Sequence, residues 1–280
     1  ARPMARKIVT LYNLMEQQLS KQEHYDFGLR AVKSVLNRAG AISRETQDAN
    51  EEVVLNRALR DMNIPKFVAE DTKLFNGLML DLFPGLDAPV VNQKSLEDAI
   101  KEELVLESLQ PSPALIYKIL QLYESKRTRH GNMVVGETLS GKTTAWKILQ
   151  HTLTSLSSRN EPGFKKVETF IINPKTVDNN ELYGSYDLNT REWSDGIIAS
   201  ILRKCCSSES DSEKWIVLDG PVDTLWIESM NTVLDDNKIL TLINGDRIAL
   251  TPTISLLFEV QNLCQASPAT VSRAGMVYFD

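Results

Sequence analysis

The segment 136–143, Gly-Glu-Thr-Leu-Ser-Gly-Lys-Thr, constrains this chain more than any other feature of the sequence. It matches the pattern G-x-x-x-x-G-K-S/T, in which glycines let backbone amides approach phosphate groups closely. The positive N-terminal end of the helix that follows favours bound anions. The lysine would contact the β- and γ-phosphates, and the threonine hydroxyl would ligate Mg²⁺. The residues expected to hold a nucleotide here are Gly136, Glu137, Thr138, Leu139, Ser140, Gly141, Lys142, Thr143 and Thr144.

The segments on both sides of this loop supply the context that such a site needs. A short apolar strand, 132–135, precedes the loop, and 142–156 is predicted to form an amphipathic helix. A second apolar strand, 215–218, ends in Asp219. In phosphate-binding folds of this kind an acid at that place holds Mg²⁺, so Asp219 and Thr143 are the expected metal ligands.

Gly220 is the residue that bears most on catalysis. ATPases of this general type commonly carry a glutamate directly after the strand-end aspartate, where it polarises the attacking water. Glycine offers no base. Asp223 or Glu228 could substitute in principle, but nothing in the sequence places either near a γ-phosphate. The sequence therefore predicts a site that binds ATP or ADP with Mg²⁺ and hydrolyses ATP poorly.

The composition narrows the class of protein. Of 280 residues, 42% are hydrophobic and 24% charged, as in a folded chain with a core. The net charge of −6 argues against a nucleic-acid partner, because such binders carry a basic field. No apolar run reaches the roughly 18–20 residues that cross a bilayer, so no membrane contact is expected. The three cysteines lack the spacing of a zinc site and fit a reducing compartment.

The chain changes character near its middle. Residues 1–125 have the apolar periodicity of helices, with expected starts at Asp26, Asn50, Asp71 and Pro113 and an expected stop at Gly40. After residue 130, short apolar runs alternate with helical segments, which is typical of a parallel sheet buried on both faces. Asn-Gly at 244–245, between two apolar runs, predicts a hairpin. We expect an α/β fold preceded by an all-α part.

Five segments resemble the motor region of dynein heavy chains. Four resemble the second AAA+ module: FVAEDTKLF (67–75), LYGSYDLNTREWSDGI (182–197), the long stretch 214–248 that contains DGPVDTLWIESMNTVLDDNK, and ASPATVSRAGMVY (266–278). HYDFGLRAVKSVLNRAG (24–40) resembles the helical lid of the first module. The resemblance covers nearly the whole chain and is axonemal rather than cytoplasmic in character.

The resemblance implies a domain order. Residues 1–64 would be the lid of the preceding module, 65–130 a linker with helices, and 131–280 a three-layer AAA+ core with a parallel sheet and helices on both faces. The core's own lid would lie beyond Asp280, and the start at Ala1 also suggests a piece of a longer protein. The implied location is cytoplasmic or cytoskeletal, in the axoneme of a cilium or flagellum.

The resemblance also implies roles for individual residues. Arg273 resembles the arginine finger offered to the neighbouring module, where a planar guanidinium stabilises charge on the γ-phosphoryl oxygens. Arg30 resembles the sensor-2 arginine of the preceding module. Phe67 and Val68 could pack on the adenine or serve only the core. Glu259 stands about where a sensor-1 asparagine is expected, and its charge would repel a γ-phosphate unless it faced elsewhere.

The expected function is therefore a share in ATP-driven movement along microtubules. This module would hold ATP–Mg²⁺ statically and lend Arg273 to its neighbour. The implied partners are the other AAA+ modules of the same chain, microtubules through distant parts, and dynein intermediate and light chains. Two alternatives stay open: a self-sufficient P-loop ATPase or kinase domain, and a structural spacer that binds no nucleotide.

Overall fold

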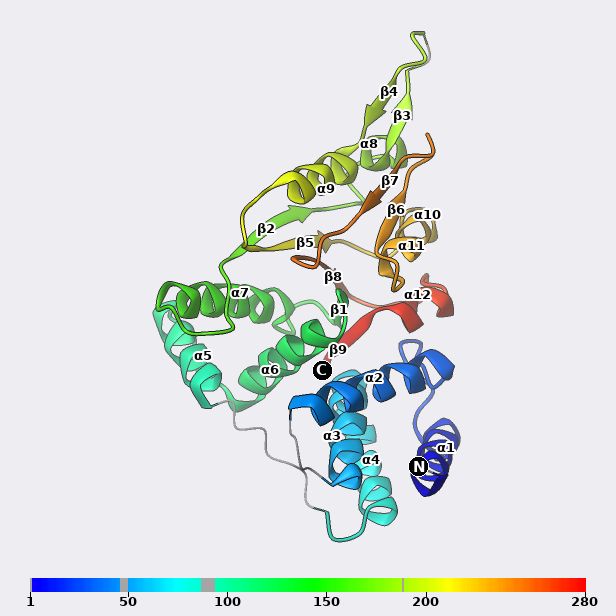
Figure 1. Cartoon of the computed structure of the whole chain (residues 1–280), viewed down its shortest axis with the longest axis vertical. Helices are drawn as coiled ribbons and strands as arrows, with labels where there is room; N and C mark the ends of the chain where they lie inside the picture. Colours follow the sequence, from blue (N-terminus) through cyan, green and yellow to red (C-terminus); the bar gives the residue numbers. More distant parts are fainter. Residues whose placement is uncertain (1, 46–49, 87–93, 188) are drawn as a thin grey trace.

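The computed structural model describes residues 2–45, 50–86, 94–187 and 189–280, and it has a helical part followed by a layered α/β part (Figure 1). The helical part consists of α1 (Arg2–Gln18), α2 (Leu29–Glu45), α3 (Glu51–Asn63), the 3₁₀ turn η1 (Ile64–Lys66) and α4 (Ala69–Leu82). Its buried side chains form one core, in which Phe67 and Phe75 pack with ring centroids 5.1 Å apart.

A local signal sets the start of α3, whereas tertiary packing decides where α2 ends. The Asn50 side chain accepts a hydrogen bond from the Glu52 amide, which caps the start of α3 as predicted. The predicted stop at Gly40 is wrong, because α2 runs on to Glu45. Ile42, two residues further, is 2% exposed, and the burial of its side chain in the helical core explains why the helix continues through the glycine.

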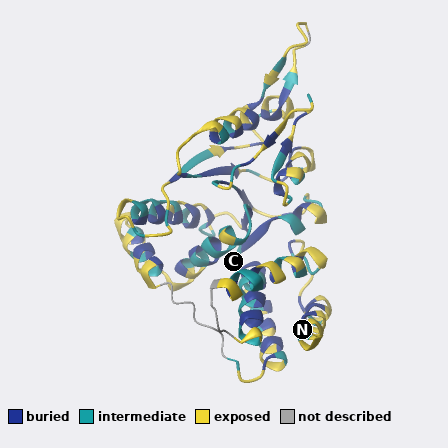
Figure 2. Ribbon diagram, viewed as in Figure 1, coloured by how far each residue is buried: buried dark blue, intermediate teal, exposed yellow. Residues whose placement is uncertain are grey.

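Five parallel strands form the central sheet in the order β2-β5-β8-β1-β9. Their bounds are β1 (Gly131–Gly136), β2 (Val167–Ile172), β5 (Glu213–Asp219), β8 (Ile254–Val260) and β9 (Gly275–Phe279). Each lies where the sequence places an apolar run. The inner strands β5, β8 and β1 are buried on both faces, as is usual in a parallel sheet, whereas the edge strand β2 is partly exposed. Figure 2 shows the interior of this layered part in dark blue.

Alternate residues of each strand enter two separate cores, one on each face of the sheet. Met133, Ile216 and Phe258 pack on one side, while Val134 and Val217 pack on the other. The second core is closed by α5 (Lys94–Leu106), α6 (Pro113–Thr128) and α7 (Lys142–Ser158). The first is closed mainly by α9 (Ile197–Ser207) and the short helices α8 (Asn179–Tyr183), α10 (Thr224–Ile227) and α11 (Asn231–Leu234). Helices on both faces of a parallel sheet confirm the predicted fold class.

Two small hairpins and one short helix complete the fold. β3 (Gly184–Tyr186) pairs with β4 (Trp193–Asp195), and β6 (Ile239–Thr241) pairs with β7 (Arg247–Ala249) around the predicted Asn-Gly turn. The β3–β4 hairpin projects at one end of the molecule (Figure 1). Helix α12 (Pro268–Arg273) packs beside α2, so the helical part touches the layered part there. Among the described residues, no helix is long and apolar enough to span a membrane.

Candidate nucleotide-binding site

Two glycines shape the loop between β1 and α7. A β-carbon on Gly136 would lie 2.3 Å from the carbonyl oxygen of Phe279, so only glycine lets the end of β1 run this close to β9. Gly141, directly before α7, has φ of +92°, a conformation that glycine adopts without strain. The loop amides and the N-terminal end of the 17-residue helix α7 therefore share one edge of the sheet.

Lys142 folds back over the loop that precedes it. Its Nζ donates hydrogen bonds to the carbonyl oxygens of Gly136 at 2.8 Å and Glu137 at 2.6 Å. The residue is 8% exposed, whereas Leu139 at the tip of the loop is 98% exposed. A buried ammonium group next to free amide donors is the donor set that a phosphate chain requires.

Thr143 and Asp219 lie on neighbouring elements at the carboxyl edge of the sheet. Asp219 is the exposed last residue of β5, and it is paired in register with Glu259 of β8. The Glu259 carboxylate accepts hydrogen bonds from the Thr143 hydroxyl and, at 2.8 Å, from the Trp146 indole N–H. Two carboxylates and a hydroxyl therefore meet at this edge, and oxygen ligands of this kind suit Mg²⁺.

The position after Asp219 is crowded as well as uncharged. A β-carbon on Gly220 would lie 2.9 Å from Asn173 Oδ1, so the amide of Asn173 fills the space where a longer side chain would begin. Asp223 caps α10 through the Leu225 amide and forms an ion pair with Lys175 at 2.7 Å. That lysine lowers the pKa of Asp223, which makes the carboxylate a weaker base.

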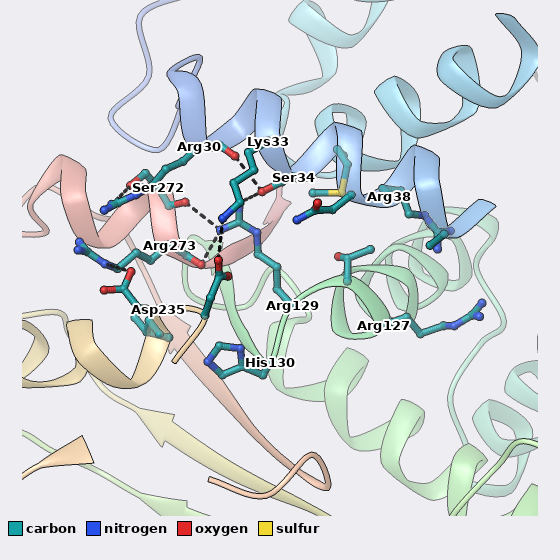
Figure 3. A pocket seen from close by; sticks show the side chains of 16 residues that line it. Arg30, Lys33, Ser34, Arg38, Arg127, Arg129, His130, Asp235, Ser272 and Arg273 are labelled. Carbon is teal, nitrogen blue, oxygen red and sulfur yellow. Dashed lines mark hydrogen bonds and ion pairs between the residues drawn. The ribbon is translucent and has the colours of Figure 1, made fainter. Parts of the chain in front are cut away.

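Two arginines from distant parts of the sequence come together on α12, as the close-up in Figure 3 shows. Arg30 of α2 donates to the Ser272 hydroxyl at 3.0 Å. Arg273 donates to the Ala269 carbonyl oxygen at 2.9 Å and to the Asp235 carboxylate at 2.6 Å. Both arginines line a pocket of about 250 Å³ between α2 and the layered part.

Arg129, which also lines this pocket, hydrogen-bonds to both α2 and α12. Its Nη1 donates to the carbonyl oxygens of Ser272 at 2.8 Å and Ala274 at 3.3 Å, where α12 ends, and Nη2 donates to the Ser34 hydroxyl of α2. A guanidinium can satisfy several carbonyls at once because its five donors lie in a rigid plane. Arg129 therefore ties the helix that carries Arg30 to the helix that carries Arg273.

The comparison with known proteins decides the family. A family model described as the hydrolytic ATP binding site of the dynein motor region matches residues 1–143. A second model, described as an AAA domain of the dynein-related subfamily, matches residues 131–274. The chain belongs to the dynein heavy chain family. The two matches meet at the loop 136–143, so they cover both the helical part and the layered part of this dynein segment.

Axonemal dyneins are among its most similar relatives. The segment is 56% identical to mouse dynein axonemal heavy chain 2 over 277 residues, which cover 99% of this chain. It is 51% identical over 284 residues, 100% of this chain, to the Dynein-1-beta heavy chain, flagellar inner arm I1 complex, of Chlamydomonas reinhardtii. It is 50% identical over 279 residues, 99% of this chain, to human dynein axonemal heavy chain 6. The segment spans only 6–7% of the length of these three relatives.

The two residues predicted to meet an adenine have different surroundings in this dynein segment. Phe67 is 1% exposed and lies among the aromatic rings of the helical core. Val68 is half-buried at the start of α4, and its amide donates to the Tyr25 hydroxyl at 3.0 Å. The packing of Phe67 accounts for its burial without a base. Contact with adenine stays a prediction for both residues.

Three residues around the sites escaped the sequence analysis. Neither Arg129 nor Trp146 belongs to a motif, so nothing in the local sequence marks them as part of a site. Gln261 also lies outside any motif, and its place follows from strand β8, which runs to Val260. Gln261 is therefore the first residue after the strand, and its amide donates to Glu137 of the loop at 2.6 Å. Val260 is 2% exposed, and its apolar side chain is the signal that extends the strand.

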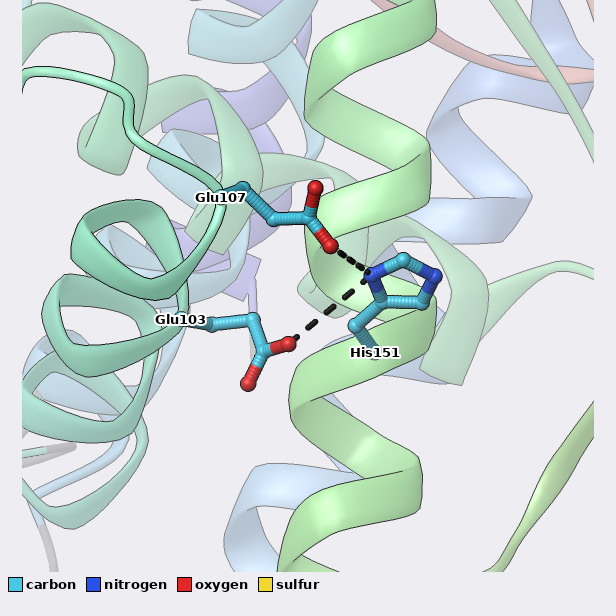
Figure 4. Close-up of side chains that lie close together, drawn as sticks. All are labelled: Glu103, Glu107 and His151. Atoms are coloured by element: carbon cyan, nitrogen blue, oxygen red, sulfur yellow. Dashed lines mark ion pairs between the residues drawn. The ribbon is translucent and has the colours of Figure 1, made fainter.

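Glu103, Glu107 and His151 form a cluster on the outer helices, away from the loop (Figure 4). Nδ1 of His151 lies 3.2 Å from Glu107 and 3.8 Å from Glu103. Since both carboxylates face the same ring nitrogen and two of the three side chains are at least 40% exposed, the geometry is that of an ion pair that joins α5 to α7.

Proposed function

We propose that this chain is part of an ATP-driven dynein motor and that its loop 136–143 binds ATP with Mg²⁺ while hydrolysing it little or not at all. The two family matches support an ATP-binding module of a dynein motor. The finer claim, binding without turnover, is argued from the residues around Gly220.

The donor set fits a nucleotide with its metal. The loop amides, the start of α7 and Lys142 suit the phosphates. Thr143 and Asp219 suit Mg²⁺, which when bound neutralises phosphate charge. Lys142 and Thr143 also make contacts within the protein, but an ammonium and a hydroxyl at these places are the groups that phosphates and Mg²⁺ require, which argues against a spacer that binds no nucleotide.

The surroundings of Gly220 carry the proposal. A general base must lie within hydrogen-bonding reach of the water that it activates. Gly220 has no side chain, Asn173 fills the adjacent space, and Asp223 is engaged by Lys175 and by the start of α10. The acid closest to the hydroxyl of Thr143 is Glu259, whose two oxygens already accept hydrogen bonds.

Equilibrium dialysis with ATP and Mg²⁺ tests the binding half of this proposal. The parent chain should retain about one nucleotide per molecule, and Lys142→Ala should retain far less. Phosphate release from the same sample tests the other half and should stay at background. A spacer would retain nothing, and a self-sufficient ATPase or kinase would turn ATP over in a manner that Lys142→Ala abolishes.

We further propose that Arg273 acts as an arginine finger toward the neighbouring module and that Arg30 serves the preceding module as its sensor-2 arginine. Their convergence on α12 supports a shared task. The finger would stabilise charge on transferring phosphoryl oxygens. The proposed partners are the other AAA+ modules of the same chain, microtubules through distant parts, and intermediate and light chains. The axonemal relatives support a place in a cilium or flagellum.

We also propose the division into a lid at 1–64, a linker with helices at 65–130 and an AAA+ core at 131–280. The core of the helical part joins residues from Ile8 to Phe83, so it includes both the proposed lid and the first part of the linker. Within the linker, α4 packs with the helical core whereas α5 and α6 cover the sheet, so the linker serves both neighbours.

A further inference from the structure

Glu259 is a buried carboxylate with both oxygens occupied. It is 8% exposed and lies in β8, a central strand of the sheet. One oxygen accepts from the Thr143 hydroxyl and the other from the Trp146 indole at 2.8 Å. Buried polar groups cost free energy unless they are hydrogen-bonded, and two donors three residues apart near the start of α7 satisfy this carboxylate.

The contact with Thr143 fixes the direction of its hydroxyl. A threonine hydroxyl has one proton and two lone pairs. While the proton points to Glu259, the lone pairs are directed elsewhere and are free to ligate a cation. Residues that hold a metal ligand in this way typically change metal affinity 10–100-fold when they are removed.

The carboxylate also adds charge beside the predicted metal ligands. Asp219 and Glu259 are register partners on adjacent parallel strands, so their side chains leave the same face of the sheet. Two negative groups at this edge repel phosphates when no cation is present and attract a divalent cation.

We infer that Glu259 is a positioning residue for the Mg²⁺ ligand Thr143 and makes ATP binding at this site strongly dependent on a divalent cation. This inference rests on the proposed function of the loop. Glu259 stands about where a sensor-1 asparagine was expected, but its carboxylate is directed to Thr143 and Trp146 of α7. Trp146 holds the second oxygen and thereby fixes the rotamer of the carboxylate.

The test compares the Mg²⁺ concentration that half-saturates ATP binding in the parent chain and in Glu259→Gln. Thr143 and Trp146 donate to different oxygens of the carboxylate, and in the amide one of these two positions becomes an NH₂ group that accepts nothing. We expect the half-saturating Mg²⁺ concentration to rise about 10-fold or more, with ATP affinity in EDTA unchanged or improved. Electron paramagnetic resonance of Mn²⁺ bound with ATP gives an independent readout of the metal environment.

Glu213→Gln is the matched control. Glu213 also accepts from an indole, that of Trp215 at 3.0 Å, but it begins β5 at the opposite end of the sheet. The Mg²⁺ concentration that half-saturates ATP binding in Glu213→Gln should equal that of the parent. If Glu259→Gln does not fold, Trp146→Phe replaces it, with an expected rise of several-fold.

The inference is overturned if folded Glu259→Gln needs the same Mg²⁺ concentration for ATP binding as the parent. The same holds for Trp146→Phe where that variant is used. A parent chain that binds no ATP with or without Mg²⁺ overturns the proposed function instead. The two failures are therefore distinguishable in one set of titrations.

Discussion

Arg30 and Arg273 both donate hydrogen bonds to the six-residue helix α12, Arg30 to the Ser272 hydroxyl at 3.0 Å and Arg273 to the Ala269 carbonyl at 2.9 Å. The first arginine belongs to the helical part and the second to the layered part. A movement of α2 is thereby linked mechanically to the position of the proposed finger, with Arg129 as the common anchor.

Replacing Arg273 tests the finger. In a complete heavy chain that contains this segment, Arg273→Ala should lower ATP turnover by about 10³–10⁵-fold, because charge on the transferring phosphoryl group loses its guanidinium partner. Nucleotide affinity at 136–143 should not change. Arg159→Ala, an exposed arginine paired with Glu102, is the control. Equal turnover in the Arg273 variant and the parent would remove the assignment.

Gly220 and Asn173 should interact energetically. Gly220→Ala should destabilise the chain by about 1–3 kcal/mol, because its β-carbon meets Asn173 Oδ1 at 2.9 Å. The double variant with Asn173→Ala should cost less than the sum of the two single changes. Gly77→Ala, in a helix with no atom within 4 Å of the new β-carbon, should be neutral or stabilising. Additive costs in urea denaturation would refute the crowding argument.

Arg38 connects three helices through a buried ion cluster. Its guanidinium contacts Asp61 of α3 at 2.9 Å and Glu124 of α6 at 2.6 Å, and its side chain is 3% exposed. Arg38→Met should cost about 3–5 kcal/mol, since two half-buried carboxylates lose the buried guanidinium that they share. Arg159→Ala at the surface should change stability by less than about 0.5 kcal/mol. Similar unfolding midpoints for both variants would contradict this account.

The burial of Lys66 should make the free energy of unfolding depend on pH. Burial lowers its pKa from the usual 10.5 to about 8, an effect that nearby Asp26 only partly opposes. Between pH 8 and 10.5 the unfolded chain keeps a proton that the folded chain has released, so folding becomes more favourable as pH rises. The stability of the parent relative to Lys66→Met should therefore increase by about 3 kcal/mol from pH 7.5 to 10.5. A constant difference in chemical denaturation would contradict the shift.

The fold was largely predictable because its signals are local. Apolar runs define all five strands of the sheet, Asn50 and Pro113 begin helices where expected, and the Asn-Gly turn joins β6 to β7. The helix end predicted at Gly40 was wrong because the tertiary packing of Ile42 outweighs the helix-stopping tendency of one glycine. The β3–β4 hairpin was missed because no Asn-Gly turn joins its two three-residue strands, whereas one joins β6 to β7.

Only those residues of the candidate site that belong to a sequence motif could be predicted. The loop 136–143 and Asp219 follow from strand and loop patterns. The other contacts join residues that lie far apart in sequence. Glu259 accepts hydrogen bonds from Thr143 and Trp146 of α7. Arg129 donates to Ser34 of α2 and to Ser272 of α12. Spacing along the chain does not encode such contacts.

The identity of the nucleotide that stays bound tests the central claim most directly. The parent chain would be loaded with ATP and Mg²⁺, freed of unbound nucleotide, incubated for hours and analysed by chromatography after denaturation. The account predicts that the bound nucleotide is recovered as ATP at all times and that Lys142→Ala retains almost none. Stoichiometric conversion of the bound ATP to ADP and phosphate would contradict it.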